Sequence, residues 1–142
     1  MKQAESKIVS DKKRTVLRVL SPIPTVPGKS TVELDGEHAP LHLTDVRPEF
    51  YFRLSDYEGV EIVRLTPKKS VRVVENVSIL QLKNDRIVDE KLDKVESFKK
   101  QEGDLLFRIW PEKPLAPGEY AVIQYAEGKL DPQIWDFTID AK

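Results

Sequence analysis

The chain has 142 residues, of which 39% are hydrophobic and 33% charged, a composition typical of one globular domain with a highly charged surface. Its formal net charge of −1 at pH 7 argues against nucleic acid or an anionic membrane as a partner. The sequence contains no cysteine, which excludes disulfides, thiolate metal sites and a cysteine nucleophile. No apolar run approaches the about 20 residues of a transmembrane segment, and Met1–Lys7 lacks the apolar core of a secretion signal.

The amino-terminal residues are expected to precede the domain. Residues 1–13 are polar and carry charges of both signs, which predicts a flexible, solvated lead-in. A single β-sandwich domain is then expected over residues 14–142, with a first strand near Arg14–Leu20. Three prolines within Ser21–Gly28 interrupt regular structure, because each proline removes a backbone hydrogen-bond donor.

The tripeptide Gly28-Lys29-Ser30 matches only the end of a phosphate-binding loop. The full pattern needs a glycine where Ile23 stands and a helix after the serine, whereas Thr31–Leu34 alternates like a strand. We therefore expect no nucleotide site here and no cofactor elsewhere.

Two histidines follow a tight-turn signal at Asp35-Gly36. This turn predicts a hairpin between the preceding strand and a short strand at Leu41–Leu43. His38 and His42 have the spacing of zinc ligands on a helix, but on a strand they would stand about 13 Å apart. Both are therefore expected to be exposed or hydrogen-bonded, with no metal site.

The segment Arg47–Leu54 has the clearest strand pattern in the sequence, with apolar residues at every second position. The alternation predicts that one set faces the core, namely Phe50, Phe52 and Leu54. The other set, Tyr51 and Arg53, is predicted to face outward.

The densest basic cluster follows this strand and comprises Arg64, Lys68, Lys69 and Arg72. We expect it to form the solvated face and tip of a hairpin. A site for an anion or an acidic partner is the alternative.

The most charged part of the chain is Asn84–Asp104. Apolar residues recur in it at helical spacing, which predicts either one short amphipathic helix near residues 87–98 or an irregular connection. These residues are Val88, Leu92, Val95 and Phe98.

A proline-rich turn joins two strand-like runs, Leu105–Trp110 and Tyr120–Tyr125. Its spacing resembles the tyrosine corner of immunoglobulin-like sandwiches, in which a tyrosine ring packs inside and its hydroxyl bonds to upstream backbone. We expect a structural role for the four residues of this corner, Leu115, Pro117, Gly118 and Tyr120. The last strand is predicted to place Trp135, Phe137 and Ile139 inward, and Asp136, Thr138 and Asp140 outward.

Alternating strands separated by turn signals predict an all-β fold. We expect a single immunoglobulin-like antiparallel β-sandwich of about 7–9 strands.

Four segments resemble a group of uncharacterised bacterial β-sandwich proteins thought to be exported: Arg47–Phe52, Val63–Lys69, Pro117–Ala121 and Trp135–Phe137. The resemblance covers about two-thirds of the chain, from Leu43 onward. It implies a cell-envelope or secreted location, although such proteins are expected to start with a signal peptide and this sequence shows none. No catalytic residues are known in the group, so the resemblance assigns none.

The sequence contains no nucleophile-elbow pattern or other catalytic constellation, so hydrolysis ranks last among the functions considered. The leading hypothesis is a non-catalytic interaction module that binds a protein partner or self-associates in an envelope assembly. The alternative is a carbohydrate-binding module, because sandwiches can present aromatic rings to sugar faces. Its candidate ligand-binding residues are Tyr51, Tyr57, Trp110 and Tyr125.

Overall fold

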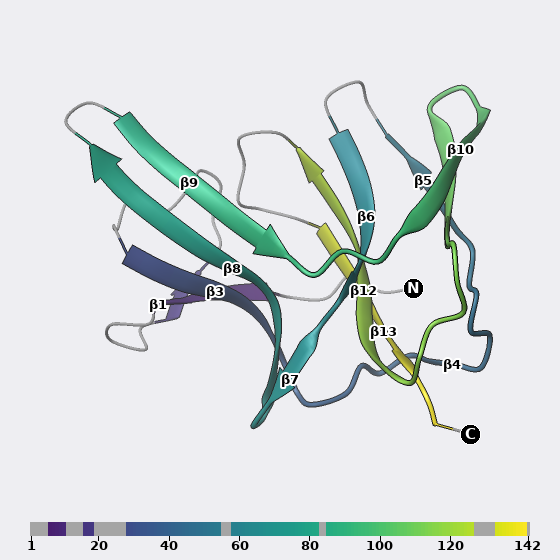
Figure 1. Ribbon diagram of the computed structural model, residues 1–142, viewed down its shortest axis with the longest axis horizontal. Helices are drawn as coiled ribbons and strands as arrows, with labels where there is room; N and C mark the ends of the chain where they lie inside the picture. The colour runs from purple at the N-terminus through teal and green to yellow at the C-terminus, as the bar shows by residue number, and fades with distance from the viewer. Residues whose placement is uncertain are drawn as a thin grey trace.

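The computed structural model describes residues 6–10, 16–18, 28–54, 58–82, 85–126 and 133–141. All regular secondary structure in this part of the chain is β, arranged in three sheets (Figure 1). The all-β, sandwich-like fold class is therefore confirmed. The described residues contain 13 strands, more than the about 7–9 expected of an immunoglobulin-like sandwich.

The four-stranded central sheet has the order β4-β13-β12-β6. Its strands are β4 (His42–Leu43), β13 (Gln133–Ile139), β12 (Gly118–Ala126) and β6 (Glu58–Arg64). Strand β12 pairs antiparallel with both β13 and β6, whereas β4 joins β13 in parallel. The parallel pair departs from the wholly antiparallel sheet that was expected.

The largest sheet has the order β2-β1-β3-β8-β7, and β9 pairs with residues 75–82 of β8. Figure 1 shows β8 and β9 on the left, away from β10 on the right. The strands are β1 (Ser6–Ser10), β2 (Val16–Arg18), β3 (Gly28–Asp35), β7 (Thr66–Lys68), β8 (Val71–Leu82) and β9 (Asp85–Leu92). Strand β1 lies within the segment expected to be a lead-in and pairs with β3.

The third sheet has three strands in the order β10-β11-β5. They are β10 (Ser97–Gly103), β11 (Leu106–Pro111) and β5 (Phe50–Arg53), all paired antiparallel.

The central sheet is buried on both faces. Ala121 and Ile123 of β12 pack with residues of β3 and β8 in one hydrophobic cluster, whereas Tyr120 and Val122 pack with residues of β5 and β11 in another. A strand covered on both sides needs apolar residues at every position, because neither face meets water. The unbroken apolar run of β12 therefore marks the middle layer of the fold.

This layering overturns the prediction that Asp136 and Thr138 face outward. The two side chains are 7% and 4% exposed, because their face of β13 meets the largest sheet. The neighbouring Phe137 and Ile139 are buried, as expected, on the other face.

The helix expected near residues 87–98 is also wrong. Strands β9 and β10 occupy the segment, and Leu92 to Ser97 connects them. Pairing of β9 with β8 satisfies backbone groups along eight residues, and this long-range pairing outweighs the helical spacing of a few apolar residues. None of the described residues forms a helix long and apolar enough to cross a membrane.

The hairpin expected at Asp35-Gly36 does not form. Strand β3 instead pairs with β1 and β8, and the chain after Gly36 runs to β4, which joins β13. Gly36 has a φ of 86°, a conformation that favours glycine, so the turn signal marked a real change of direction. The signal did not specify the partner strand.

Candidate functional site

The outer face of the β10-β11-β5 sheet gathers aromatic and charged side chains. Side chains alternate between the faces of a strand, and cross-strand partners share a face. The register pairs Tyr51 with Arg108 and Phe98 with Trp110. With Phe50 and Ile109 buried on the opposite face, Tyr51, Arg108, Trp110 and Phe98 form a stripe, here called the aromatic face.

Arg108 holds the centre of the aromatic face. Its guanidinium carbon lies 4.4 Å from the ring centroid of Trp110, a cation–π geometry. Its Nη1 donates to a carboxylate oxygen of Glu49 at 3.0 Å, and its Nε lies 2.9 Å from a carboxylate oxygen of Glu102. These contacts fix the guanidinium, so the face is preorganised.

Exposed hydrophobic side chains concentrate around this stripe. Tyr51 is 57% exposed and Phe98 is 45% exposed, and Leu105 in the β10–β11 turn is also 45% exposed. These three are the exposed large hydrophobic side chains of the described part of the chain. Tyr51 and Phe98 lie on strands of one sheet, and Leu105 lies in the turn between two strands of that sheet. Clustering of this kind, unlike scattered surface leucines, is typical of an interaction surface.

The four aromatic candidates from the sequence do not form one surface. Tyr51 and Trp110 share the aromatic face, and the centroid of the Trp110 ring lies 5.6 Å from that of the Phe98 ring. Tyr125 instead packs against the cluster between the central and largest sheets. Tyr57 lies outside the described residues.

Sequence reasoning missed Phe98, Arg108 and Glu102. The sequence predicts a short helix or an irregular connection around Phe98, and the two charged residues could not be assigned to a face before the strands were paired. Phe98 is followed by four polar residues, so the segment has no period-two pattern and offers no local signal for this face.

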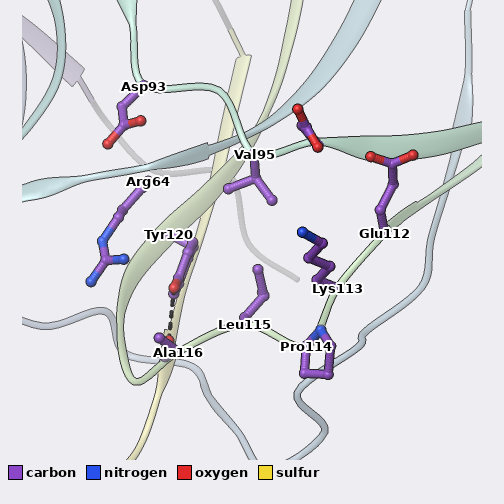
Figure 2. Close-up of a pocket in the computed structure, with 10 residues that line it drawn as sticks. Arg64, Asp93, Val95, Glu112, Lys113, Pro114, Leu115, Ala116 and Tyr120 are labelled. Atoms are coloured by element: carbon purple, nitrogen blue, oxygen red, sulfur yellow. Dashed lines mark hydrogen bonds between the residues drawn. The ribbon is translucent and has the colours of Figure 1, made fainter.

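The predicted corner forms a cleft of about 420 Å³, shown in Figure 2. The buried Tyr120 donates its hydroxyl hydrogen to the carbonyl oxygen of Ala116 at 2.7 Å, four residues upstream. Leu115 is buried beside it, Pro117 is exposed, and Gly118 has a φ of 155°. This is the geometry of a tyrosine corner.

Charged residues surround the corner cleft. Arg64 lies 5.7 Å from the ring centroid of Tyr120, and Figure 2 shows Asp93 on the same side of the ring. Burial raises the pKa of the Tyr120 hydroxyl above its ordinary value, while the charge of Arg64 opposes the rise and that of Asp93 adds to it. The rim also carries Glu96, Glu112 and Lys113. The rim carries charges of both signs, so it favours neither an anionic nor a cationic ligand.

The four basic residues do not form one patch. Arg64 borders the corner cleft, and Lys68 and Lys69 are exposed at the β7–β8 turn. Arg72 is only 2% exposed and its Nη1 donates to Asp136 at 2.7 Å, so its prediction as a solvated residue is wrong. Arg72 is buried because the face of β8 that carries it packs against the central sheet.

A buried polar network surrounds Arg72. Glu119 accepts hydrogen bonds from the hydroxyl of Thr138 at 2.8 Å and from the backbone nitrogen of Ala39 at 2.9 Å. Arg72 Nη1 lies 3.6 Å from the same Glu119 oxygen. Glu119 and Asp136, the two carboxylates that contact Arg72, are 3% and 7% exposed. Such burial suits a structural tie between sheets rather than a site open to substrate.

Both histidines contact carboxylates at the edge of this region. His38 Nδ1 lies 3.1 Å from Glu119 and His42 Nδ1 lies 2.8 Å from Asp140, and both rings are partly exposed. Their expected state, exposed or hydrogen-bonded, is confirmed. Among the described residues, no three histidine or carboxylate side chains group as metal ligands would.

No known protein family, curated protein or solved structure matches the chain. The resemblance to exported bacterial proteins therefore stays a prediction. Residue geometry alone carries the functional argument.

Proposed function

We propose that the protein is a non-catalytic interaction module that docks a protein partner on the aromatic face. The observation that carries this proposal is the concentration of exposed hydrophobic side chains around the fixed guanidinium of Arg108. Aromatic residues and arginine are the residue types enriched at the centres of protein interfaces and among their energetic hot spots.

The preorganisation of Arg108 supports this role. A partner need not order this side chain, because Glu49, Glu102 and Trp110 already hold it. Binding therefore costs less side-chain entropy than it would for a free arginine. Exposed Lys100 flanks Arg108 in the register and can pair with an acidic group at the rim of a partner.

Carbohydrate recognition has less support. A sugar platform needs several free ring faces, but one face of Trp110 lies under Arg108 and Tyr125 packs on the core. Tyr51 is the one candidate ring of the described three that is clearly exposed.

The test compares partner capture by full-length variants. Tyr51→Ser with Phe98→Ser removes the two most exposed rings of the aromatic face, and Lys68→Ser with Lys69→Ser is the matched surface control. The lysine pair should change stability by no more than about 0.5 kcal/mol per site, because both residues are exposed. The aromatic pair should cost about 0.5–1.5 kcal/mol more, because Phe98 loses its ring contact with Trp110, and urea unfolding checks that both variants are folded. In titrations with the purified partner protein, the wild type and the lysine control should bind it. The aromatic-face variant should lose this binding. Equal binding by all three proteins contradicts the proposal.

A further inference from the structure

Strand β5 ends the β10-β11-β5 sheet, and its outer edge pairs with no strand in the described part of the chain. The backbone nitrogen of Leu54 donates to the carbonyl oxygen of Leu105 in the neighbouring turn at 2.9 Å. Backbone groups alternate in direction along a strand, so those of Phe50 and Phe52 face β11 and those of Tyr51 and Arg53 face outward. The outward direction of the Arg53 carbonyl agrees with its 3.4 Å contact to the side-chain amide of Gln124.

Open space lies along this edge. A cleft of about 400 Å³ is lined by the five consecutive residues Glu49–Arg53, with Gln124, Gln133 and Trp135 of the central sheet opposite them. A strand edge that pairs with no other strand of the described part and lies beside open space can accept an added strand.

The side chains of β5 point to the identity of that strand. Glu49, Tyr51 and Arg53 share the outer face and are exposed. This face therefore carries an acidic, an aromatic and a basic side chain in that order along the strand. In an antiparallel pair of two such strands centred on Tyr51, each Glu49, whose carboxylate also accepts from Arg108 of its own chain, lies opposite the other copy's Arg53. The two Tyr51 rings then meet at the twofold axis. Opposite charges and paired aromatic residues across strands both stabilise such a pairing.

We propose that β5 pairs antiparallel with β5 of a second copy of this chain, joining two three-stranded sheets into one continuous sheet. The Tyr51 pair and the two Glu49–Arg53 pairs would exchange about six backbone hydrogen bonds, in which each Arg53 carbonyl exchanges its 3.4 Å contact with Gln124 for a backbone donor of the second copy. The two aromatic faces become neighbours on one side of the dimer, which would present docking surfaces in duplicate. This inference rests on the strand edge and does not need the proposed partner of the aromatic face.

Analytical ultracentrifugation of the full chain tests the dimer. Measurements run from about 1 µM to about 1 mM, a range that covers small, transient interfaces. We expect a reversible monomer–dimer equilibrium within it. A protein that stays monomeric throughout overturns the proposal, including the case in which the edge serves a peptide of another protein.

Charge reversal tests the register. Glu49→Arg and Arg53→Glu each place like charges opposite one another, so each should weaken the dimer by about tenfold or more. The double variant restores opposite charges across the axis and should recover the dimer, less the contribution of the Glu49 contact with Arg108 within each copy. An equimolar mixture of the two single variants should form a heterodimer, because one copy then carries two cations and the other two anions. The mixture also shows that the single variants remain folded.

Matched reversals at exposed sites away from β5, Glu37→Arg and Lys68→Glu, should leave the dimer unchanged. Loss of dimer in these controls, or equal affinity in all the β5 variants, overturns the proposed register.

Amide hydrogen exchange gives a second, residue-level test. Protection of the Tyr51 and Arg53 amides should rise with protein concentration, because these amides face away from β11 and pair with no strand of the described part of the chain. The Phe50 and Phe52 amides should be protected at every concentration by β11. Concentration-independent exchange at Tyr51 and Arg53 in a protein that dimerises would place the interface elsewhere and overturn the proposal.

Discussion

The guanidinium of Arg72 donates a 2.7 Å hydrogen bond to the carboxylate of Asp136, and the pair ties the largest sheet to the central sheet across 64 positions of sequence. Arg72 also donates to the carbonyl oxygens of Gly36 and Asp35 at 2.9 and 3.0 Å. One buried side chain thus holds two sheets and the turn that follows β3.

Replacing Arg72 with methionine should therefore destabilise the fold severely. The substitution leaves the Asp136 and Glu119 carboxylates buried without their cation, which costs about 3–5 kcal/mol of unfolding free energy. Urea unfolding measures the loss. Lys68→Met is the control at an exposed position on the adjacent strand β7 and should change stability by no more than about 0.5 kcal/mol. A small effect of Arg72→Met would mean that the network contributes little to holding the sheets together.

The sequence predicts the class of this fold better than its layers. Alternation correctly placed Phe50 in the core and Tyr51 on the surface, because β5 has one buried and one exposed face. It failed for Asp136, because a two-layer sandwich was assumed and β13 lies in a middle layer. Only the unbroken apolar run from Tyr120 to Ile123 signalled burial on both faces.

The aromatic face could be predicted only in part. Tyr51 and Trp110 were identified as candidates, but their common surface depends on the register of β11 with β5 and β10, which no local pattern specifies. Phe98 has an apolar neighbour at helical spacing, Val95, whereas Glu96 and Lys100 at strand spacing are charged, so only the pairing with Trp110 shows its place on β10.

Tyr120→Phe tests the corner. The variant keeps the ring but removes the hydroxyl bond to Ala116, so we expect a loss of about 1 kcal/mol of unfolding free energy. Ala116 is exposed, so water can replace the lost donor at its carbonyl and limit the cost. Chemical denaturation measures the change, and dimerisation should not differ from the wild type because β5 is untouched. No loss of stability would contradict a structural role for the bond.

The same residue predicts a difference in alkaline stability. Burial raises the Tyr120 pKa in the folded protein above its ordinary value of 10.0. The unfolded chain therefore releases this proton first as the pH rises, and ionisation stabilises the unfolded state. The contribution of Tyr120 is complete below pH 10 and is lost as the pH rises through the folded-state pKa. Unfolding titrations should show a steeper alkaline decline for the wild type than for Tyr120→Phe, and parallel curves would contradict this.

Gly59→Ala should destabilise the protein because of one close approach. A Cβ at Gly59 would lie 2.7 Å from the Cζ of Tyr125, its cross-strand partner. The ring must move from its place on the core, at a cost of about 1 kcal/mol or more. In a Tyr125→Ala background the same change should be neutral or stabilising, because glycine weakens a strand interior. A double-mutant cycle of thermal unfolding measures this coupling, and additive effects would show that the two residues do not constrain each other.

Leu105→Gly should stabilise the β10–β11 turn. Leu105 has a φ of 58°, a left-handed conformation that is unfavourable for a residue with a side chain, and it is 45% exposed, so its own burial offsets little of the strain. Relief of this strain, less the greater entropy of glycine in the unfolded chain, leaves a gain of about 0.5–1 kcal/mol. Leu106→Gly is the matched control one residue later: Leu106 begins β11 and is half-buried, so this change should destabilise. A gain in stability for Leu105→Gly together with weaker partner binding would show that Leu105 contributes to docking and lowers the stability of the turn. A loss of stability would contradict the strain argument.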